Sequence, residues 1–254
     1  MKTFIQLTEK HTNPDIIDKL KHPIKLDAKR LEQLKGDYSA YEDIAFEQWQ
    51  GYPFPKNSSN QTFNELKTLM SLGQFRTEWE EEMIMYDTKV LKPFKDYAET
   101  YGIEVDFTRI KSLMEQTQPI LLALKGFYNR PRPSVLAKKI GLSMTFFPLI
   151  TSKTPSYPSG HATQGHLVSL LVADELPLEH RRNVLKIGKR IGESRQIAGA
   201  HYPSDTAFGI ELGDEFYRLS KTSVGQEPEL ELESIMSKLK ENDMINEETV
   251  VAIN

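Results

Sequence analysis

Apolar positions along the chain are spaced as they are in helices. Over most of the sequence, apolar side chains recur at intervals of three and four residues, as on one face of an α-helix. The segments with this pattern are 27–35, 62–72, 74–94, 106–125, 160–174, 179–200 and 207–220. The stretch 37–60 is rich in Gly, Pro, Asn and Ser, and we expect an extended loop around one helical turn there. The pattern therefore predicts an all-α protein.

Polar and proline residues predict where several of these helices begin and end. Asp106 suits an N-cap, and the helix that it starts would present Lys125 at its C-terminal end. The prolines on either side of Arg132 disfavour helical geometry in the residues before them, which places Arg132 on a turn beyond that helix. In the long pattern from 74 to 94, Pro93 is expected to kink the helix.

Three short blocks carry most of the chemically informative residues. They read K-x6-R-P from Lys125 to Pro133, P-S-G-H from Pro158 to His161, and S-R-x5-H-x3-D from Ser194 to Asp205. Two arginines and a lysine can bind a tetrahedral oxyanion, because the arginine fork pairs with two oxygens and lysine adds a point charge. Gly160 allows close backbone approach to an anion at a helix start. The blocks predict an oxyanion site in which three cations offset developing charge without Mg²⁺.

Taken singly, each of these residues has an ordinary interpretation. Lysine and arginine on helices are normally solvated, and Ser159 alone would be an N-cap. Arg130 lies in the same basic turn but outside the spacing, and we interpret it as a charge at the rim of the site. His166 is interpreted as structural and Ser194 as a packing residue. Only the combination of the three blocks favours a functional site.

The three blocks resemble the phosphate-binding signature of the type 2 phosphatidic acid phosphatase (PAP2) superfamily. Its members include the bacterial class A non-specific acid phosphatases and the vanadium haloperoxidases. The resemblance implies a single-domain helical bundle and a soluble phosphatase that hydrolyses phosphate monoesters without a metal or other cofactor. It also implies a phosphate cage made of Lys125, Arg132, Ser159, Gly160 and Arg195.

The resemblance further implies roles for two histidines and a carboxylate. His201 would attack phosphorus to form a phosphohistidine, and Asp205 would accept the proton of one ring nitrogen and so fix the tautomer. His161 would protonate the leaving oxygen and then serve as the base for water. Two rivals stay open: a vanadium-dependent haloperoxidase, which uses the same cage for vanadate, and a non-catalytic phosphate-binding module, which has no need of the His–Asp pair.

Composition narrows the class of protein. The 254 residues are 39% apolar, carry a formal net charge of −4 and contain no cysteine. Disulfides, cysteine-ligated zinc and thiol catalysis are thereby excluded, and general affinity for nucleic acid is not expected. No H-E-x-x-H or comparable metal-ligand spacing occurs. The substrate expected is a small phosphate monoester, with a homo-oligomer left open.

The length of the apolar stretches bears on location. Polar residues interrupt the start of the chain after two apolar positions, and the longest apolar stretches, 144–150 and 167–173, are far shorter than a membrane span of about twenty residues. We therefore expect a cytoplasmic protein without a membrane span. Along the chain we expect an N-terminal helical region (1–105), a catalytic core (106–222) and a peripheral acidic segment (223–254), all in one compact domain.

Overall fold

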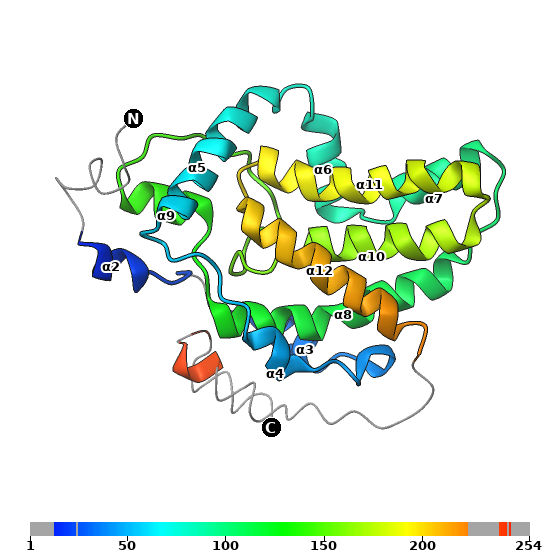
Figure 1. Cartoon of the computed structure of the whole chain (residues 1–254), viewed down its shortest axis with the longest axis horizontal. Coiled ribbons are helices and arrows are strands. Elements are labelled where there is room, and N and C mark those ends of the chain that lie inside the picture. The colour runs from blue at the N-terminus through cyan, green and yellow to red at the C-terminus, as the bar shows by residue number, and fades with distance from the viewer. Residues whose placement is uncertain (1–12, 24, 223–238, 243, 245–254) are drawn as a thin grey trace.

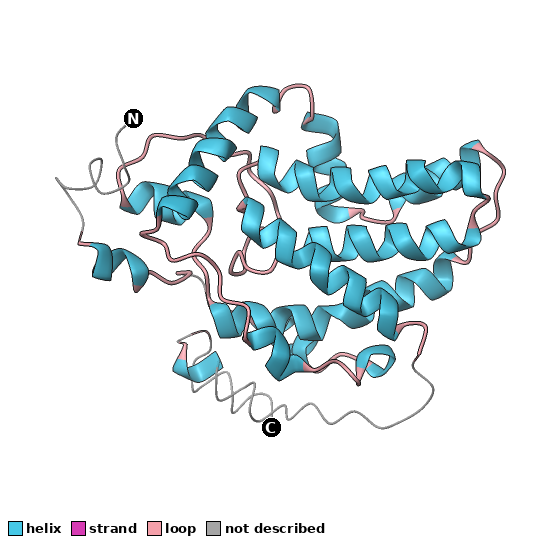
Figure 2. Cartoon of the chain, in the orientation of Figure 1, coloured by secondary structure: helices cyan, strands magenta, loops and turns pink. Residues whose placement is uncertain are grey.

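The computed structural model describes residues 13–23, 25–222, 239–242 and 244. All regular secondary structure in these residues is helical (Figure 2). The prediction of an all-α fold is confirmed. The elements are α2 (Pro14–Asp18), α3 (Ala28–Leu34), η1 (Ser39–Tyr41), α4 (Phe46–Gln50), α5 (Asn60–Leu72), η2 (Gly73–Phe75), α6 (Glu80–Thr88), α7 (Lys92–Thr100), α8 (Phe107–Tyr128), α9 (Pro133–Lys139), α10 (Gly160–Glu175), α11 (Leu178–Ile197) and α12 (Pro203–Leu219).

Helix α10 lies at the centre of the bundle. It packs against α11 and α12, which run beside it, and against α8 (Figure 1). The core between these helices consists of apolar side chains that are almost completely removed from water: Leu121, Leu124, Leu167, Val168, Leu171, Val172, Ile191, Leu212 and Phe216. Their burial is the main force that holds together the helices that carry the site.

Glycines allow the central helices to approach each other closely. A Cβ atom at Gly188 of α11 would lie 2.6 Å from the carbonyl oxygen of Gly165 in α10. A Cβ atom at Gly209 of α12 would lie 2.7 Å from the carbonyl oxygen of Ser159. Both neighbours are backbone atoms that cannot turn aside, so any larger residue at these positions would push α11 or α12 away from α10.

Helix ends place two of the predicted cations. Asp106 caps α8 by accepting hydrogen bonds from the amides of Thr108 (3.1 Å) and Arg109 (3.0 Å), as predicted. At the other end Asn129 takes a left-handed conformation with φ of 46°, which stops the helix just after Lys125. Arg132, the residue that precedes α9, has an extended backbone conformation.

The predicted single helix over 74–94 is wrong. The structure has two helices, α6 and α7, which are separated at residues 89–91, and Pro93 lies in the first turn of α7. A proline is tolerated in a first turn but disfavours helix in the residue before it, so the break precedes Pro93 instead of forming a kink at it. The short helix α9 also falls outside the predicted set. Most of the acidic segment 223–254 lies outside the described residues.

None of the helices in the described residues combines the length and the apolar character that crossing a lipid bilayer requires.

Candidate active site

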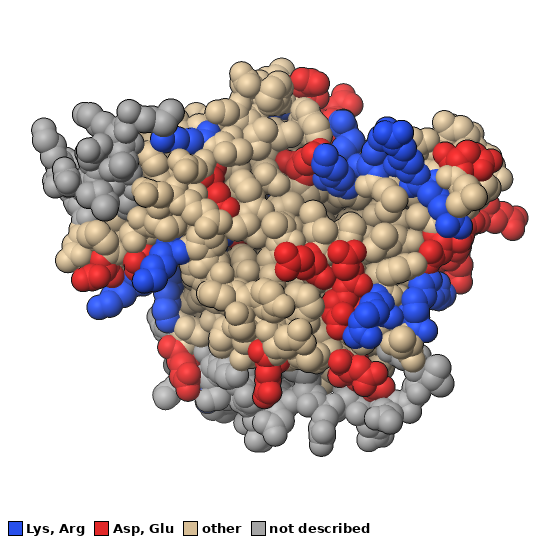
Figure 3. Space-filling view, viewed as in Figure 1, with Lys and Arg blue, Asp and Glu red and all other residues tan. Residues whose placement is uncertain are grey.

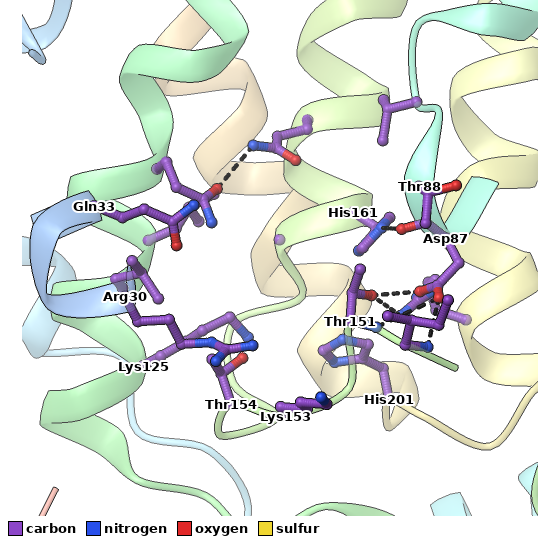
Figure 4. A pocket seen from close by; sticks show the side chains of 18 of the residues that line it. Arg30, Gln33, Asp87, Thr88, Lys125, Thr151, Lys153, Thr154, His161 and His201 are labelled. Carbon is purple, nitrogen blue, oxygen red and sulfur yellow. Dashed lines mark hydrogen bonds and ion pairs between the residues drawn. The ribbon is translucent and has the colours of Figure 1, made fainter. Parts of the chain in front are cut away.

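The three sequence blocks meet around one cavity of about 570 Å³. Six of the eight predicted site residues line it: Lys125, Arg132, Gly160, His161, Arg195 and His201. In Figure 4, Lys125 lies on one side of the cavity, His161 on the opposite side with Asp87 and Thr151, and His201 at one end. The remaining two, Ser159 and Asp205, are buried behind the lining.

Lys125 is held in place by two backbone carbonyl groups. Its ammonium donates hydrogen bonds to the carbonyl oxygens of Pro155 (2.8 Å) and Pro158 (2.6 Å), and Pro158 is the first residue of the second block. Burial, and then the positive charge of Arg132, lower the pKa of Lys125 well below its usual value. An anion in the cavity would offset the repulsion between Lys125 and the neighbouring cations and so favour the charged form of Lys125.

Arg132 joins the first block to the third. Its Nε donates to the carbonyl oxygen of Thr154 (2.8 Å), and its Nη1 donates to the carbonyl oxygen of Ala200 (2.8 Å) and lies 2.9 Å from Nε2 of His201. Burial and the nearby charge of Arg195 lower the pKa of Arg132 to about 9. Arg132 therefore remains positively charged at neutral pH and fixes the position of the His201 ring.

Arg195 is paired with a carboxylate that the sequence did not reveal. Its Nη1 lies 2.8 Å from Oδ1 of Asp87, at the end of α6, and its Nη2 donates to the hydroxyl of Thr151 (3.0 Å). Its Nε has no hydrogen-bond partner in the described residues. Burial lowers the pKa of Arg195, although Asp87 opposes this. Burial alone would raise the pKa of Asp87, but the bonds from Thr151 and Arg195 hold it below its usual value.

Asp87 also anchors His161. Nε2 of His161 lies 3.2 Å from the backbone carbonyl oxygen of Asp87, and since a carbonyl only accepts, this nitrogen carries a hydrogen. Burial, followed by the charge of Arg195, lowers the pKa of His161 to about 3. Without an anion in the cavity, this ring is therefore neutral over most of the acidic range.

His201 and Asp205 form the hydrogen bond that their spacing predicts, but not within a helix. His201 precedes α12, and its Nδ1 lies 3.2 Å from Oδ2 of Asp205, in the first turn. The same oxygen accepts a hydrogen bond from the amide of Tyr202 (3.0 Å). Because Arg132 can only donate to Nε2, Nδ1 must carry the ring hydrogen. Burial, and then Arg132, lower the pKa of His201 well below its usual value.

Ser159 and Gly160 begin α10 in different ways. Ser159 is fully buried, and its hydroxyl accepts a hydrogen bond from the amide of Ala162 (3.4 Å), as an N-cap does. A Cβ atom at Gly160 would meet only the side chain of Leu121, at 3.8 Å. Packing within the protein therefore does not require glycine at this position, although the residue lines the cavity.

The interpretation of Arg130 as a rim charge is wrong. Its side chain is fully buried, and its Nη1 donates to Oδ1 of Asp205 (2.6 Å) while its Nη2 lies 3.2 Å from Oε2 of Glu65 in α5. The guanidinium stacks on the ring of Tyr202, 3.8 Å from its centroid. Burial opposes the charge, but Asp205, Tyr202 and Glu65 together raise the pKa of Arg130. The arginine thus lies behind the His–Asp pair, away from the cavity lining.

Two other residues have the surroundings expected of structural groups. His166 lies outside the cavity lining, and its Nε2 is 2.7 Å from Oδ1 of Asp214 on the surface of α12. Ser194 is fully buried, and its hydroxyl donates to the carbonyl oxygen of Ile191 (2.8 Å) within α11.

Comparison with known proteins agrees with this geometry. Residues 117–216 match the family model described as the PAP2 superfamily. This segment of the chain is similar to the PAP2 superfamily. All eight predicted site residues lie within this PAP2 segment, whereas Asp87, Glu65 and α3 lie outside it. The resemblance to the PAP2 superfamily is therefore confirmed.

Several proteins with a sequence similar to this chain are acid phosphatases. An acid phosphatase from Zymomonas mobilis is 30% identical over 164 residues, which are 59% of this chain and 57% of the relative. A non-specific acid phosphatase from Salmonella typhimurium is 36% identical over 96 residues, which are 37% of this chain and 38% of the relative. The chain thus spans about half of the length of these relatives, or less.

Two further features are the distribution of charge on the surface and the arrangement of possible metal ligands. On the face seen in Figure 3, lysine and arginine side chains are interspersed with aspartate and glutamate. Among the described residues, no group of three or more histidine, aspartate or glutamate side chains is arranged to hold a metal ion.

Proposed function

We propose that this protein hydrolyses phosphate monoesters through a phosphohistidine formed on His201, without a metal ion. The observation that carries the proposal is the hydrogen bonding of the His201 ring. Nδ1 faces the carboxylate of Asp205 and Nε2 faces a group that can only donate, so Nε2 keeps a lone pair beside a cationic cavity. A neutral, oriented imidazole is the form that a nucleophile requires.

Binding would use the cations of the cage. The phosphate oxygens would accept hydrogen bonds from Lys125, Arg132 and Arg195, whose pKa values are all lowered and whose charges are therefore relieved by an anion. Arg132 would turn its Nη1 from the His201 ring to a phosphate oxygen, which frees the lone pair on Nε2. The amide at Gly160 would approach a further oxygen at the start of α10.

The first chemical step breaks the ester bond. Nε2 of His201 attacks phosphorus, the bond between phosphorus and the leaving oxygen breaks, and that oxygen takes a proton from His161. Asp205 stabilises the positive ring that forms, because it accepts the Nδ1 hydrogen. The charge of the bound phosphate would favour the protonated form of His161, whose pKa is only about 3 without it.

The second step hydrolyses the phosphohistidine and regenerates the free enzyme. Water attacks phosphorus, its proton passes to His161, and the bond between phosphorus and Nε2 breaks, so that inorganic phosphate leaves. In both steps the cage would stabilise charge on the transferring group and hold it in line, which are the terms that dominate phosphoryl transfer.

Trapping of the intermediate tests the proposal. Wild-type protein mixed with ³²P-labelled phenyl phosphate and quenched in alkali is expected to carry a label that acid removes. His201→Ala should carry none, while still binding vanadate. His166→Ala is the matched control, because it also removes a histidine bonded to an aspartate, but outside the cavity. Label in His201→Ala, or no release of phosphate by wild type, would refute the proposal.

The same proteins discriminate the two rivals. Oxidation of halide with added vanadate and peroxide, in place of phosphate release, would favour the haloperoxidase. Tight phosphate binding with neither activity would favour a binding module. The cytoplasmic location, the division at residues 105 and 222 and a homo-oligomer stay predictions.

A further inference from the structure

The cavity extends well beyond the phosphate cage. Its volume of about 570 Å³ lies in the range of pockets that enclose whole small molecules, roughly 300–1,000 Å³. Besides the cage residues, the lining includes apolar side chains, which are those of Val90, Met114, Leu121 and Leu122. The space left next to the cage suits the organic part of a phosphate ester.

A second group of charged residues lines the cavity and is partly or fully exposed to solvent, and we call it the mouth cluster: Asp27, Lys29, Arg30 and Lys153. Lys29 and Arg30 come from α3, and Lys153 precedes Thr154, whose carbonyl oxygen accepts a hydrogen bond from Arg132 of the cage. In Figure 4, Arg30 lies on the same side of the cavity as Lys125. The mouth cluster is thus adjacent to the cage in the lining of the same cavity, but none of its residues belongs to the cage.

Arg30 is held in place within the cluster. Asp27 caps α3 by accepting a hydrogen bond from the amide of Arg30 (3.0 Å), and its other oxygen pairs with the guanidinium of Arg30. The side chain of Arg30 is only 18% exposed. An arginine tied in this way loses little further entropy when it binds an anion.

The mouth cluster has an excess of positive charge. One carboxylate faces three cations, and the pKa of Asp27 is lowered, first by the amide of Arg30 and then by the charges of Arg30 and Lys153, although slight burial opposes this. Lys29 and Lys153 are exposed and form no ion pair with the part of the chain that the structure describes. The cluster therefore offers two unneutralised charges to a ligand in the cavity.

Across the cavity the wall is different. There the lining consists of Thr88, Ile150 and Thr151, together with Asp87, whose carboxylate already pairs with Arg195. An anionic group on the ligand would consequently be attracted to the side of α3 and Lys153. Charge is distributed asymmetrically around the organic part of any bound ester.

We infer that the mouth cluster is a second anion subsite, so that the substrates are phosphate monoesters whose leaving group carries a further phosphate or carboxylate. The inference rests on the proposed function, because it names the substrate class of the same site. Lys29 and Arg30 of α3 lie outside the segment that matches the PAP2 model, whereas Lys153 lies within it, so this preference would rest in part on this chain's own N-terminal region.

Matched aryl esters test the subsite. We would measure kcat/KM for phenyl phosphate, 4-carboxyphenyl phosphate and 1,4-phenylene bisphosphate at low ionic strength. Exposed ion pairs contribute about 0.2–1 kcal/mol each, so two or three of them predict a preference of about tenfold for the esters with a second charge. The preference should appear chiefly in KM and should weaken in about 1 M salt, where the Debye length falls to about 3 Å.

Charge removal gives the decisive comparison. In the triple variant Lys29→Gln, Arg30→Gln and Lys153→Gln, the ratio of kcat/KM between the doubly charged esters and phenyl phosphate should fall from about ten to near one. Lys138→Gln with Lys139→Gln is the control, because both lysines are exposed on α9 outside the cavity lining. It should leave the ratio as it is in wild type.

The outcomes separate the two proposals. Turnover of phenyl phosphate with equal efficiency on all three esters would overturn the subsite and leave the phosphatase intact. Failure of wild type to release phosphate from any ester would overturn the proposed function itself. A preference for the bisphosphate alone would identify the second group as a phosphate, whereas an equal preference for the carboxylate would identify a general anion subsite.

Discussion

Arg130 and Asp205 meet through a hydrogen bond of 2.6 Å between Nη1 and Oδ1, and neither side chain is exposed to solvent. The other oxygen of Asp205, Oδ2, accepts a hydrogen bond from Nδ1 of His201. The carboxylate is therefore held from both sides, by a permanent cation behind it and by the proposed nucleophile in front. Glu65 of α5 in turn accepts from Arg130 and from the amide of Ser204 (2.8 Å), which ties this chain of charges to the start of α12.

Loss of Arg130 should therefore destabilise the fold strongly. In Arg130→Leu, the carboxylates of Asp205 and Glu65 stay buried without their common cation, and breaking a buried pair in this way costs about 3–5 kcal/mol. Urea unfolding at pH 7 measures the loss of free energy of unfolding.

Arg190→Leu is the matched control for this measurement. Arg190 also pairs with one glutamate, Glu82 (2.6 Å), and stacks on one aromatic ring, that of Trp79 (4.1 Å), but its side chain is 43% exposed. A loss of about 1 kcal/mol or less is expected there. Equal losses in the two variants would mean that burial of the Arg130 network is energetically unimportant.

Asp205→Asn should lower turnover by at least about 10²-fold. Arg130 can only donate, so it will hold the amide oxygen of the new side chain and turn its NH₂ toward His201 and the amide of Tyr202. An NH₂ group facing Nδ1 drives the ring hydrogen to Nε2 and removes the lone pair. Steady-state kcat on phenyl phosphate tests this, and turnover within about threefold of wild type would disprove the orienting role.

The pH dependence should reveal His161 as the acid. Its pKa of about 3 applies to the empty site, and the bound phosphate should raise it. Since kcat/KM reports the free enzyme and kcat the complex, the decline of kcat/KM with rising pH should occur at lower pH than that of kcat, after correction for substrate ionisation. Both profiles are measured with phenyl phosphate between pH 3 and 8.

His161→Ala supplies the corresponding mutant result. The alkaline decline of kcat should disappear, and the loss of rate should be greater for phenyl phosphate than for p-nitrophenyl phosphate, whose leaving group needs no proton. Equal losses on both esters would assign His161 to phosphate binding instead of acid catalysis.

Chelators and vanadate test the cage. Lys125, Arg132 and Arg195 line the cavity at the proposed phosphate position and would repel a divalent cation, so activity should persist in EDTA. Vanadate, which adopts a trigonal-bipyramidal geometry, should inhibit competitively with the substrate. Activity lost in EDTA and restored by Mg²⁺ or Zn²⁺ would contradict the cage as the source of charge stabilisation.

His22 should make the fold sensitive to acid. It is buried, its Nδ1 has no hydrogen-bond partner in the described residues, and burial followed by the charge of Arg132 lowers its pKa to about 4. A lowered histidine pKa stabilises the folded state above about pH 6.5, and this contribution is lost as pH falls from 6.5 toward 4. A shift from 6.5 to about 4 corresponds to about 3 kcal/mol.

Unfolding in urea at intervals from pH 7.5 to 4 measures this dependence. His22→Gln should show a shallower decline of unfolding free energy over the same range, while its value at pH 7.5 shows whether the fold is preserved. An unchanged slope would mean that the acid sensitivity arises from other groups.

The sequence by itself determined most helices of the core and brought forward the candidate residues of the cage. Helical periodicity and caps such as Asp106 act within a few residues, so they can be recognised without knowledge of what lies across the fold. The spacing of the three blocks revealed the resemblance to the PAP2 superfamily for a similar reason. The break before Pro93 was misplaced because a proline excludes helix only locally and several breaks satisfy it.

The tertiary structure decided which partners these residues have. Asp87 and Glu65 are separated from the blocks by long stretches of chain, and in the sequence they are indistinguishable from solvated acidic residues nearby. Arg130 and Arg132 are two residues apart in one basic turn, yet one lies behind Asp205 and the other lines the cavity. A side chain's charge partner depends on segments that packing brings together, and the burial of a cation is favourable only once those partners are in place.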